Sequence, residues 1–231
     1  RIINLTQTTS GSYLLLASLD ISRRNLALRG EESFAKVMDM AEYARREINE
    51  IGGYYAYGKE LVNGTSVYDY DVTKLSVHTL GLGLAGIEVY DLLRDEYDIQ
   101  IEFGDVSNIL AYISIGDRLQ DIERLVGALA DIARIYKKDS TGMLSGEFIS
   151  PIVARSPQEA FYSAKESLPV EKTEGRISGE FVMCYPPGIP ILAPGEMITD
   201  EIIQYILYVK EKGCSMQGTE DKSVNKLKVL V

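Results

Sequence analysis

The sequence predicts an α+β fold in which N-terminal helices lead into a small antiparallel-sheet α/β sandwich, followed by a C-terminal α/β module. Three observations predict it. Apolar residues recur at helical spacing over residues 13–51. Strand-like segments at 99–103 and 108–115 are separated by only a few residues, which requires antiparallel pairing. Short helical and strand patterns alternate beyond residue 150. The expected domains are residues 1–53, 54–140 and 141–231.

Two helices are expected at the start of the chain. The first, over residues 13–30, is apolar nearly all round, which predicts burial, and Ser10 or Ser12 is its expected cap. The second, over residues 31–51, has one apolar stripe and ends at Gly52.

The middle of the chain predicts a small sheet covered by helices. Tyrosines and glycines over residues 54–71 favour loops and short edge strands. The elements expected next are a strand at 75–79, a helix from Gly86 to Tyr97, strands at 99–103 and 108–115, and a helix to Lys138 that begins with Asp117 and Gln120 as a capping box.

The last third carries a clear helix start, because Ser156, Pro157 and Glu159 supply a cap, a first-turn proline and a capping-box acid. That helix is expected to reach residue 167. The remaining expected elements are a strand at 176–184, a proline-rich loop at 185–196, a helix from Thr199 or Asp200 to Lys212, and a strand at 226–231.

Composition excludes several classes of function. The chain has 24 Lys and Arg against 34 Asp and Glu, a net charge of −10, and lacks the basic surface that binding to nucleic-acid phosphates requires. It contains no apolar run of about 18 residues that would predict a membrane span. Two cysteines form neither a disulfide framework nor a metal motif, so a reducing, cytoplasmic compartment is expected. The start at Arg1, with no signal-peptide pattern, indicates a fragment of a longer protein.

Gly81, Gly83 and Gly86 form a GxGxxG motif between a strand and a helix, with Glu102 and Asp105 near the position of a ribose-binding acid. One reading is a dinucleotide site. The other is a helix that packs closely on a sheet, and the antiparallel pairing predicted for the next two strands favours it.

Several other candidate residues and segments have both a structural and a functional interpretation. His78 is the only histidine, which leaves no second imidazole for a triad or a zinc site and favours a structural role. Cys184 and Cys214 lack basic neighbours and are interpreted as packing or surface thiols. The hydroxyl-rich segment at 6–12 either caps a helix or binds a phosphate. The proline-rich segment at 180–196 either forms rigid turns or lines a pocket for a cation.

Several motifs occur in one order over most of the chain. They are Gln7-Thr8-Thr9-Ser10, Asp71-x-Thr73-Lys74-Leu75, Gly81-Leu82-Gly83, Ile115-Gly116-Asp117, Ser156-Pro157, Gly175-Arg176-Ile177-Ser178 and Tyr185-Pro186-Pro187-Gly188-Ile189-Pro190. In this order they resemble the C-terminal half of the pyridoxal-phosphate-dependent ornithine, lysine and arginine decarboxylases of fold type I.

The resemblance implies a parent enzyme that converts arginine to agmatine, lysine to cadaverine or ornithine to putrescine, with pyridoxal phosphate as the electron sink. It places the Schiff-base lysine and the other catalytic residues before the present segment, so residues 1–53 would end the large cofactor domain. No catalytic residue and no metal ligand are expected here, and the chain alone is expected to be inactive.

The resemblance also implies site residues and partners. Thr8, Thr9 and Ser10 are expected to reach the cofactor phosphate of a partner subunit, although Gly11 stands where many relatives have proline. Glu180, Tyr185 and Glu196 are expected on the side of the basic amino-acid substrate. The expected partners are the missing N-terminal cofactor domain and a second copy in a homodimer or higher oligomer, so helix 13–30 of a fragment would expose apolar surface. Two alternatives remain: a stand-alone assembly or ligand-sensing module, and an NAD-binding domain.

Overall fold

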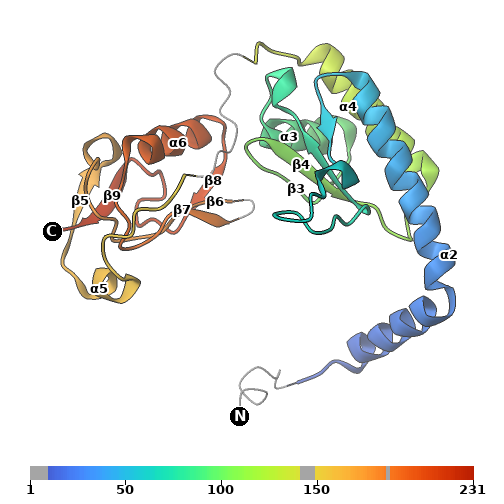
Figure 1. The fold of residues 1–231 in the computed structure, drawn as a ribbon, viewed down its shortest axis with the longest axis horizontal. Helices are drawn as coiled ribbons and strands as arrows, with labels where there is room; N and C mark the ends of the chain where they lie inside the picture. Colours follow the sequence, from blue (N-terminus) through green and yellow to red (C-terminus); the bar gives the residue numbers. More distant parts are fainter. Residues whose placement is uncertain (1–9, 141–148, 186–187) are drawn as a thin grey trace.

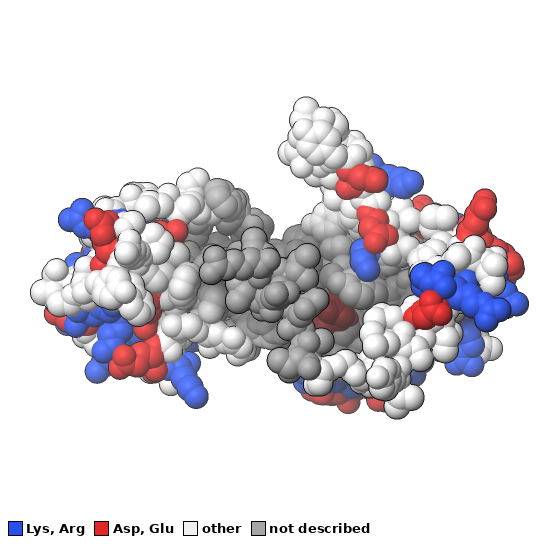
Figure 2. Space-filling model, turned by 90° about the horizontal axis from the view of Figure 1, so that it is seen from below, with Lys and Arg blue, Asp and Glu red and all other residues white. Residues whose placement is uncertain are grey.

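The computed structural model describes residues 10–140, 149–185 and 188–231, which form two lobes of mixed helices and antiparallel strands (Figure 1). The N-terminal lobe comprises residues 10–140 and the C-terminal lobe residues 149–231. This confirms the predicted α+β class. No helix of the described ranges is long and apolar enough to cross a membrane. Acidic and basic side chains are interspersed over both lobes on the face that Figure 2 displays.

The N-terminal lobe begins with one helix, α2, which runs from Tyr13 to Ile51. The prediction of two helices is wrong because Gly30 continues the helix. A glycine inside a helix costs only about 1 kcal/mol relative to alanine, and good helix formers surround this one. Buried residues of α2 begin at Val37, whereas the expected burial of residues 13–30 is wrong for this chain: Leu14 is 84% exposed. This half projects away from the lobe (Figure 1) and carries the apolar surface expected of a fragment.

The sheet of the N-terminal lobe has the strand order β1-β2-β4-β3, and every pair is antiparallel. Its strands are β1 (Tyr55–Ala56), β2 (Lys74–His78), β3 (Phe103–Gly104) and β4 (Asn108–Tyr112). Only the last residue of the strand expected at 99–103 belongs to β3. The antiparallel pairing of β3 and β4 confirms the prediction from their short connection.

Helices α3 (Gly86–Tyr97) and α4 (Leu119–Ile135) complete this lobe. The expected capping box of α4 is wrong by one residue. The Asp121 carboxylate accepts from the Arg118 backbone N–H at 3.0 Å, while Asp117 accepts from Ser114 N–H at 2.6 Å and closes the preceding turn.

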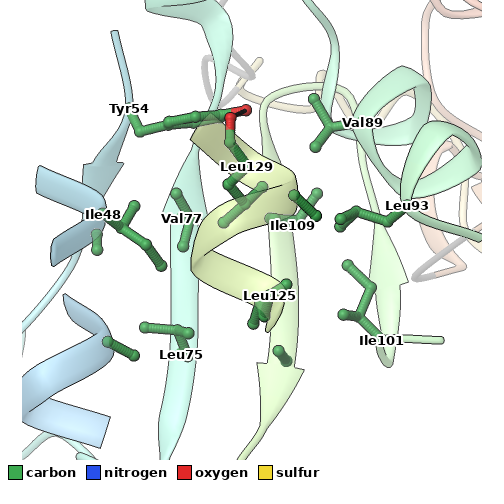
Figure 3. Close-up of a cluster of buried hydrophobic side chains, with 14 of the residues drawn as sticks. Ile48, Tyr54, Leu75, Val77, Val89, Leu93, Ile101, Ile109, Leu125 and Leu129 are labelled. Atoms are coloured by element: carbon green, nitrogen blue, oxygen red, sulfur yellow. Dashed lines mark hydrogen bonds between the residues drawn. The ribbon is translucent and has the colours of Figure 1, made fainter. Parts of the chain in front are cut away.

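One face of the sheet carries the core, because buried and half-buried residues alternate along β2 and β4. Figure 3 shows side chains from α2, α3, α4 and the sheet meeting in this layer. They include Ile48, Leu75, Val77, Leu93, Ile109 and Leu129.

The C-terminal lobe contains two small antiparallel sheets, β5-β9 and β7-β6-β8. Its elements are α5 (Pro157–Tyr162), β5 (Lys165–Pro169), β6 (Val182–Tyr185), β7 (Ile189–Leu192), α6 (Asp200–Glu211), β8 (Ser215–Gln217) and β9 (Lys226–Leu230). Ser156 and Thr199 cap α5 and α6, as predicted.

Three predictions for this lobe are wrong in extent. The helix expected to reach residue 167 ends at Tyr162, because the following residues pair with β9. The strand expected over 176–184 begins at Val182, and only isolated bridges precede it. The loop expected over 185–196 contains β7, whose Pro190 is tolerated because β7 is an edge strand.

The two lobes share a small apolar contact. Val106, from the turn between β3 and β4, clusters with Cys184, Val209 and Cys214 of the C-terminal lobe. Ile87, Tyr205 and other partly buried side chains pack against this cluster. The turn before β4 and the start of α3 therefore face β6 and the end of α6.

Candidate functional site

The segment expected to reach a cofactor phosphate lies at the start of α2. Thr8 and Thr9 lie outside the described residues, and Ser10 is exposed. Ser12 occupies the N-cap position with extended backbone and makes no side-chain capping bond, and the first turn carries no acidic residue. Because first-turn amides point out of a helix and carry partial positive charge, this end has the chemistry that an anion prefers.

Glu180 holds together three segments of the C-terminal lobe. Its two carboxylate oxygens accept from the backbone N–H groups of Glu220, at 2.9 Å, and Lys228, at 2.8 Å. The preceding Ser178 donates to the Glu180 carbonyl through its hydroxyl, at 2.7 Å. The Glu180 side chain thus satisfies two backbone donors beside β9.

The backbone of Glu196 lies near that of Glu180: the N–H of Ser178, two residues before Glu180, donates to the Glu196 carbonyl at 2.8 Å. Its carboxylate accepts from Ala193 N–H at 2.8 Å and closes the turn after β7. Gly195 within this turn has φ +95°, and an added Cβ would overlap the Arg155 carbonyl oxygen. Glu196 therefore supports a tight turn at the proline-rich segment.

Tyr185 ends β6, and its side chain is half exposed. Its ring lies against Gly188, where a Cβ would lie 3.3 Å from a ring carbon. The structure thus ties both carboxylates to the backbone and leaves Tyr185 at the hairpin end. The assignment of Glu180, Tyr185 and Glu196 to a substrate stays a prediction.

The three glycines of the GxGxxG motif each have a packing reason. A Cβ at Gly81 would lie 2.6 Å from the Gly53 carbonyl oxygen, and one at Gly86 would overlap the Asn108 carbonyl oxygen. Gly83 has φ +69°, and a Cβ there would lie 2.6 Å from the Lys138 carbonyl oxygen. Because protein backbone lies against each of these glycines, their place in the chain is explained by the close helix entry favoured by the sequence.

A polar cluster that the sequence did not reveal lies on the N-terminal lobe. Tyr57 donates its hydroxyl to Asn108 Oδ1 at 3.3 Å, and His78 Nδ1 lies 3.3 Å from the same oxygen. Asn108 N–H in turn donates to Asp105 at 2.7 Å. Burial and the charge of Asp105 raise the pKa of Tyr57. His78 therefore bonds within a protein network, which agrees with the structural role inferred for it.

Arg45 is a second residue that the sequence reading missed. Although charged, it is only 5% exposed. Its guanidinium donates to the carbonyls of Tyr57 and Val72 and to the Glu42 carboxylate. It fixes both ends of the tyrosine-rich loop to α2. Its position four residues after Ala41, on the buried stripe, was the available signal.

Comparison with known proteins gives this geometry a context. Residues 146–222 match the family model described as Orn/Lys/Arg decarboxylase, C-terminal domain. Arginine decarboxylase of Bacillus subtilis strain 168 is 40% identical and covers 99% of this chain. Arginine decarboxylase of Halalkalibacterium halodurans is 41% identical with the same coverage. The match covers 47% of either relative, so the chain spans about half the length of these proteins.

Solved structures share the fold. The constitutive lysine decarboxylase of Escherichia coli aligns with a TM-score of 0.70 at 18% identity, covering 99% of this chain and 45% of that one. Lysine decarboxylase A of Pseudomonas aeruginosa aligns with a TM-score of 0.66 and covers 98% of this chain and 44% of that one. The solved structures thus share the fold, and the family match and the two sequence relatives show that the chain is similar to the C-terminal portion of an Orn/Lys/Arg decarboxylase.

Proposed function

We propose that the protein to which this chain belongs decarboxylates arginine to agmatine with pyridoxal phosphate as cofactor. The observation that carries this proposal is the 40% identity to a named arginine decarboxylase over 99% of the chain. Likeness to lysine decarboxylases in sequence covers less of the chain, 45% at 30% identity for the constitutive enzyme of Escherichia coli. Lysine is therefore the second candidate substrate, with cadaverine as product.

The described residues near the start of α2 fit a cofactor phosphate in their chemistry. Ser10 is exposed, and the first turn of α2 has neither a side-chain cap nor an acidic residue to repel an anion. Thr8, Thr9 and Ser10 would hold the phosphate of the cofactor in a partner subunit. When bound, the cofactor would supply an electron sink for the electron pair that stays on the α-carbon when the carboxyl group leaves as carbon dioxide.

The chain alone is proposed to be inactive, because the Schiff-base lysine belongs to the part of the protein that precedes it. Two features support this: the relatives are about twice as long, and the first half of α2 exposes a row of leucines. An apolar surface of this kind indicates a missing partner surface. The preceding cofactor domain is its proposed cover, and the intact enzyme is proposed to be a homodimer or higher oligomer in the cytoplasm.

The decisive experiment restores the missing half. The segment of the Bacillus subtilis relative that precedes the matched region is fused to this chain, and agmatine, cadaverine and putrescine are measured after incubation with arginine, lysine or ornithine. Agmatine is the expected main product, and this chain alone with pyridoxal phosphate gives none. The matched control replaces the Schiff-base lysine of the added half. A fusion that retains the cofactor but decarboxylates none of the three substrates contradicts the proposal.

The residue roles are tested in the same fusion. S10A is expected to weaken retention of pyridoxal phosphate during dialysis, whereas S18A, on the exposed face of α2, leaves it unchanged. Tyr185→Phe and Glu196→Gln are expected to raise the KM for arginine more than kcat falls, as loss of a substrate contact does. An unchanged KM in both variants removes these residues from the substrate side.

The alternatives have less support. The NAD-binding alternative has little support, because every strand pair described in the sheet beside the motif is antiparallel, whereas a dinucleotide-binding unit is built on a parallel sheet. A stand-alone module has no specific contact in its favour.

A further inference from the structure

The two cysteines of the chain are brought together by the C-terminal sheet. Cys184 lies in β6, and Cys214 immediately precedes β8, which pairs with β6. Cys184 pairs with Met216 of β8. Cys214 lies two residues before Met216, so its side chain lies on the same side of the sheet and diagonal to Cys184. Both side chains are buried, with exposures of 7% and 8%, in the contact between the lobes.

The thiols also contact each other directly, as their shared hydrogen bond shows. This bond and burial raise the pKa of Cys184, which therefore keeps its proton and donates it. The same bond lowers the pKa of Cys214, the acceptor. We take Cys214, which accepts this bond and lies in the turn before β8 rather than within a strand, as the thiol that attacks first.

A disulfide would require a small shift of the backbone around Cys214. Diagonal residues of an antiparallel ladder lie roughly 7–8 Å apart, slightly beyond the usual separation in a disulfide. Cys214 lies outside the ladder, held by one bond from its N–H to the Val209 carbonyl at 3.1 Å. The preceding Gly213 has φ +80° and no neighbouring atom within 4 Å of an added Cβ. A disulfide therefore requires Cys214 to move toward β6, and the turn outside the ladder is where that movement would occur.

We propose that Cys184 and Cys214 are a redox site that forms a reversible intramolecular disulfide when the chain meets a hydroperoxide. The Cys214 thiolate attacks one oxygen of hydrogen peroxide, the O–O bond breaks, the other oxygen leaves as hydroxide and takes up a proton to give water, and a sulfenic acid forms. The Cys184 sulfur then attacks the Cys214 sulfur, and water leaves as the S–O bond breaks. Overall, two thiols lose two electrons and two protons, and hydrogen peroxide is reduced to two molecules of water.

The product would close a loop that contains the end of β6 and the whole of β7 and α6. That loop begins beside Tyr185, and its closing bond lies against Val106 of the other lobe. Oxidation therefore stiffens the C-terminal side of the lobe contact, and a reductant releases it.

The test uses the chain as it is, because these are its only two cysteines. The purified chain is treated with hydrogen peroxide, denatured, and titrated for free thiols, and its intact mass is measured. Two thiols are expected to fall to none, with a mass loss of about 2 Da for two hydrogen atoms. Dithiothreitol restores both thiols. On a non-reducing gel the oxidised chain runs as a monomer.

Three results overturn the proposal. The first is that the chain keeps two free thiols under conditions that fully oxidise a small dithiol in the same solution. The second is oxygen added to separate cysteines without loss of hydrogen, and the third is a cross-linked dimer as the main product.

Two single variants test the order of attack and serve as each other's control. With hydrogen peroxide and dimedone, C184S is expected to yield more trapped sulfenic acid than C214S, because Cys214 is the attacking thiol. The reverse ratio contradicts the assignment of the attacking thiol. Neither variant can form the intramolecular disulfide, so a mass loss of two hydrogen atoms in a monomeric variant also contradicts the proposed disulfide.

Discussion

Gly86 lies where the first turn of α3 crosses the start of β4, and hydrogen is the only side chain that fits. An added methyl group would overlap the backbone carbonyl of Asn108, which is itself paired in the sheet. Asn108 cannot move away without disturbing its pairing with His78 in the sheet. The same glycine that matches a nucleotide motif in the sequence is therefore required for packing.

Gly86→Ala is expected to reduce the free energy of unfolding by roughly 3 kcal/mol, the upper end for overpacking. Urea denaturation followed by circular dichroism measures it. Gly127→Ala is the matched control, because Gly127 lies exposed within α4 with no atom within 4 Å of an added Cβ. It is expected to stabilise the chain by about 0.5–1 kcal/mol through helix propensity. Equal effects of the two substitutions would contradict the packing role of Gly86.

The two glutamates of the proline-rich segment at 180–196 make a second point at the residue scale. Glu180 and Glu196 attract attention in the sequence as partners for a cation. In the fold, each accepts from backbone N–H groups of its own lobe, Lys228 and Ala193 among them. A carboxylate that accepts from such donors is held in one position, so any contact with a substrate would be made by a group already fixed in place.

At the scale of an element, α5 is governed by its capping box. Ser156 Oγ accepts from Glu159 N–H at 3.3 Å, and the Glu159 carboxylate accepts from Ser156 N–H at 2.8 Å. These bonds, first from the backbone and then from the hydroxyl of Ser156, lower the pKa of Glu159 below 4.5. Because the folded pKa is lowered, the stabilisation is present above pH 4.5 and is lost as the pH falls through the folded pKa.

A carboxyl-carbon NMR titration is therefore expected to give Glu159 a midpoint below 4.5. Ser156→Ala removes one of the bonds and moves the midpoint part of the way back. Ser167→Ala, on the neighbouring strand β5, leaves it in place and controls for substitution itself. A midpoint at or above 4.5 in the unsubstituted chain would disprove the capping contribution.

The exposed half of α2 makes a second prediction at this scale. Leu15 and Leu19 are each 66% exposed in a helix segment that contacts no core. The isolated chain is expected to self-associate through this face, since burying each leucine gains roughly 1.5–3 kcal/mol. Leu15→Glu with Leu19→Glu is expected to weaken association by at least about tenfold. Sedimentation equilibrium measures this.

The control for that experiment is Ser18→Glu with Ser22→Glu, which adds the same charge to the same helix without removing apolar surface. The control chain is expected to associate more strongly than the leucine double variant. If both variants are equally monomeric, charge repulsion alone explains the result and the apolar face is not the cause.

At the scale of the whole molecule, the apolar contact between the two lobes involves few side chains of the described residues. Val106 is 4% exposed and is the member of the lobe contact contributed by the β3–β4 turn. Val106→Ala is expected to cost about 1–2 kcal/mol in the free energy of unfolding. It is also expected to speed amide hydrogen exchange in β6 and the end of α6, which lie across the contact.

Ile135→Ala is the comparison variant, because Ile135 ends α4 and is 53% exposed. It is expected to change neither quantity beyond about 0.5 kcal/mol. Unchanged exchange in the C-terminal lobe of Val106→Ala would show that the lobes are energetically independent.

The sequence by itself determined the features that depend on neighbouring residues. The caps at Ser156 and Thr199 follow from hydrogen bonds between residues three apart, and the antiparallel pair β3–β4 follows from a connection too short for any other arrangement. The α+β class and the likeness to the decarboxylases also follow from local patterns that keep their order along the chain.

Only the tertiary structure decided the features that depend on distant residues. Residues 165–169 form a strand because β9, some sixty residues later, pairs with them. Gly30 lies inside α2 rather than at its end, and Arg45 is buried because the carbonyls of a distant loop accept hydrogen bonds from its guanidinium. Cys184 and Cys214 meet only through the register of β6 and β8. Such contacts are set by long-range pairing, which short-range periodicity does not encode.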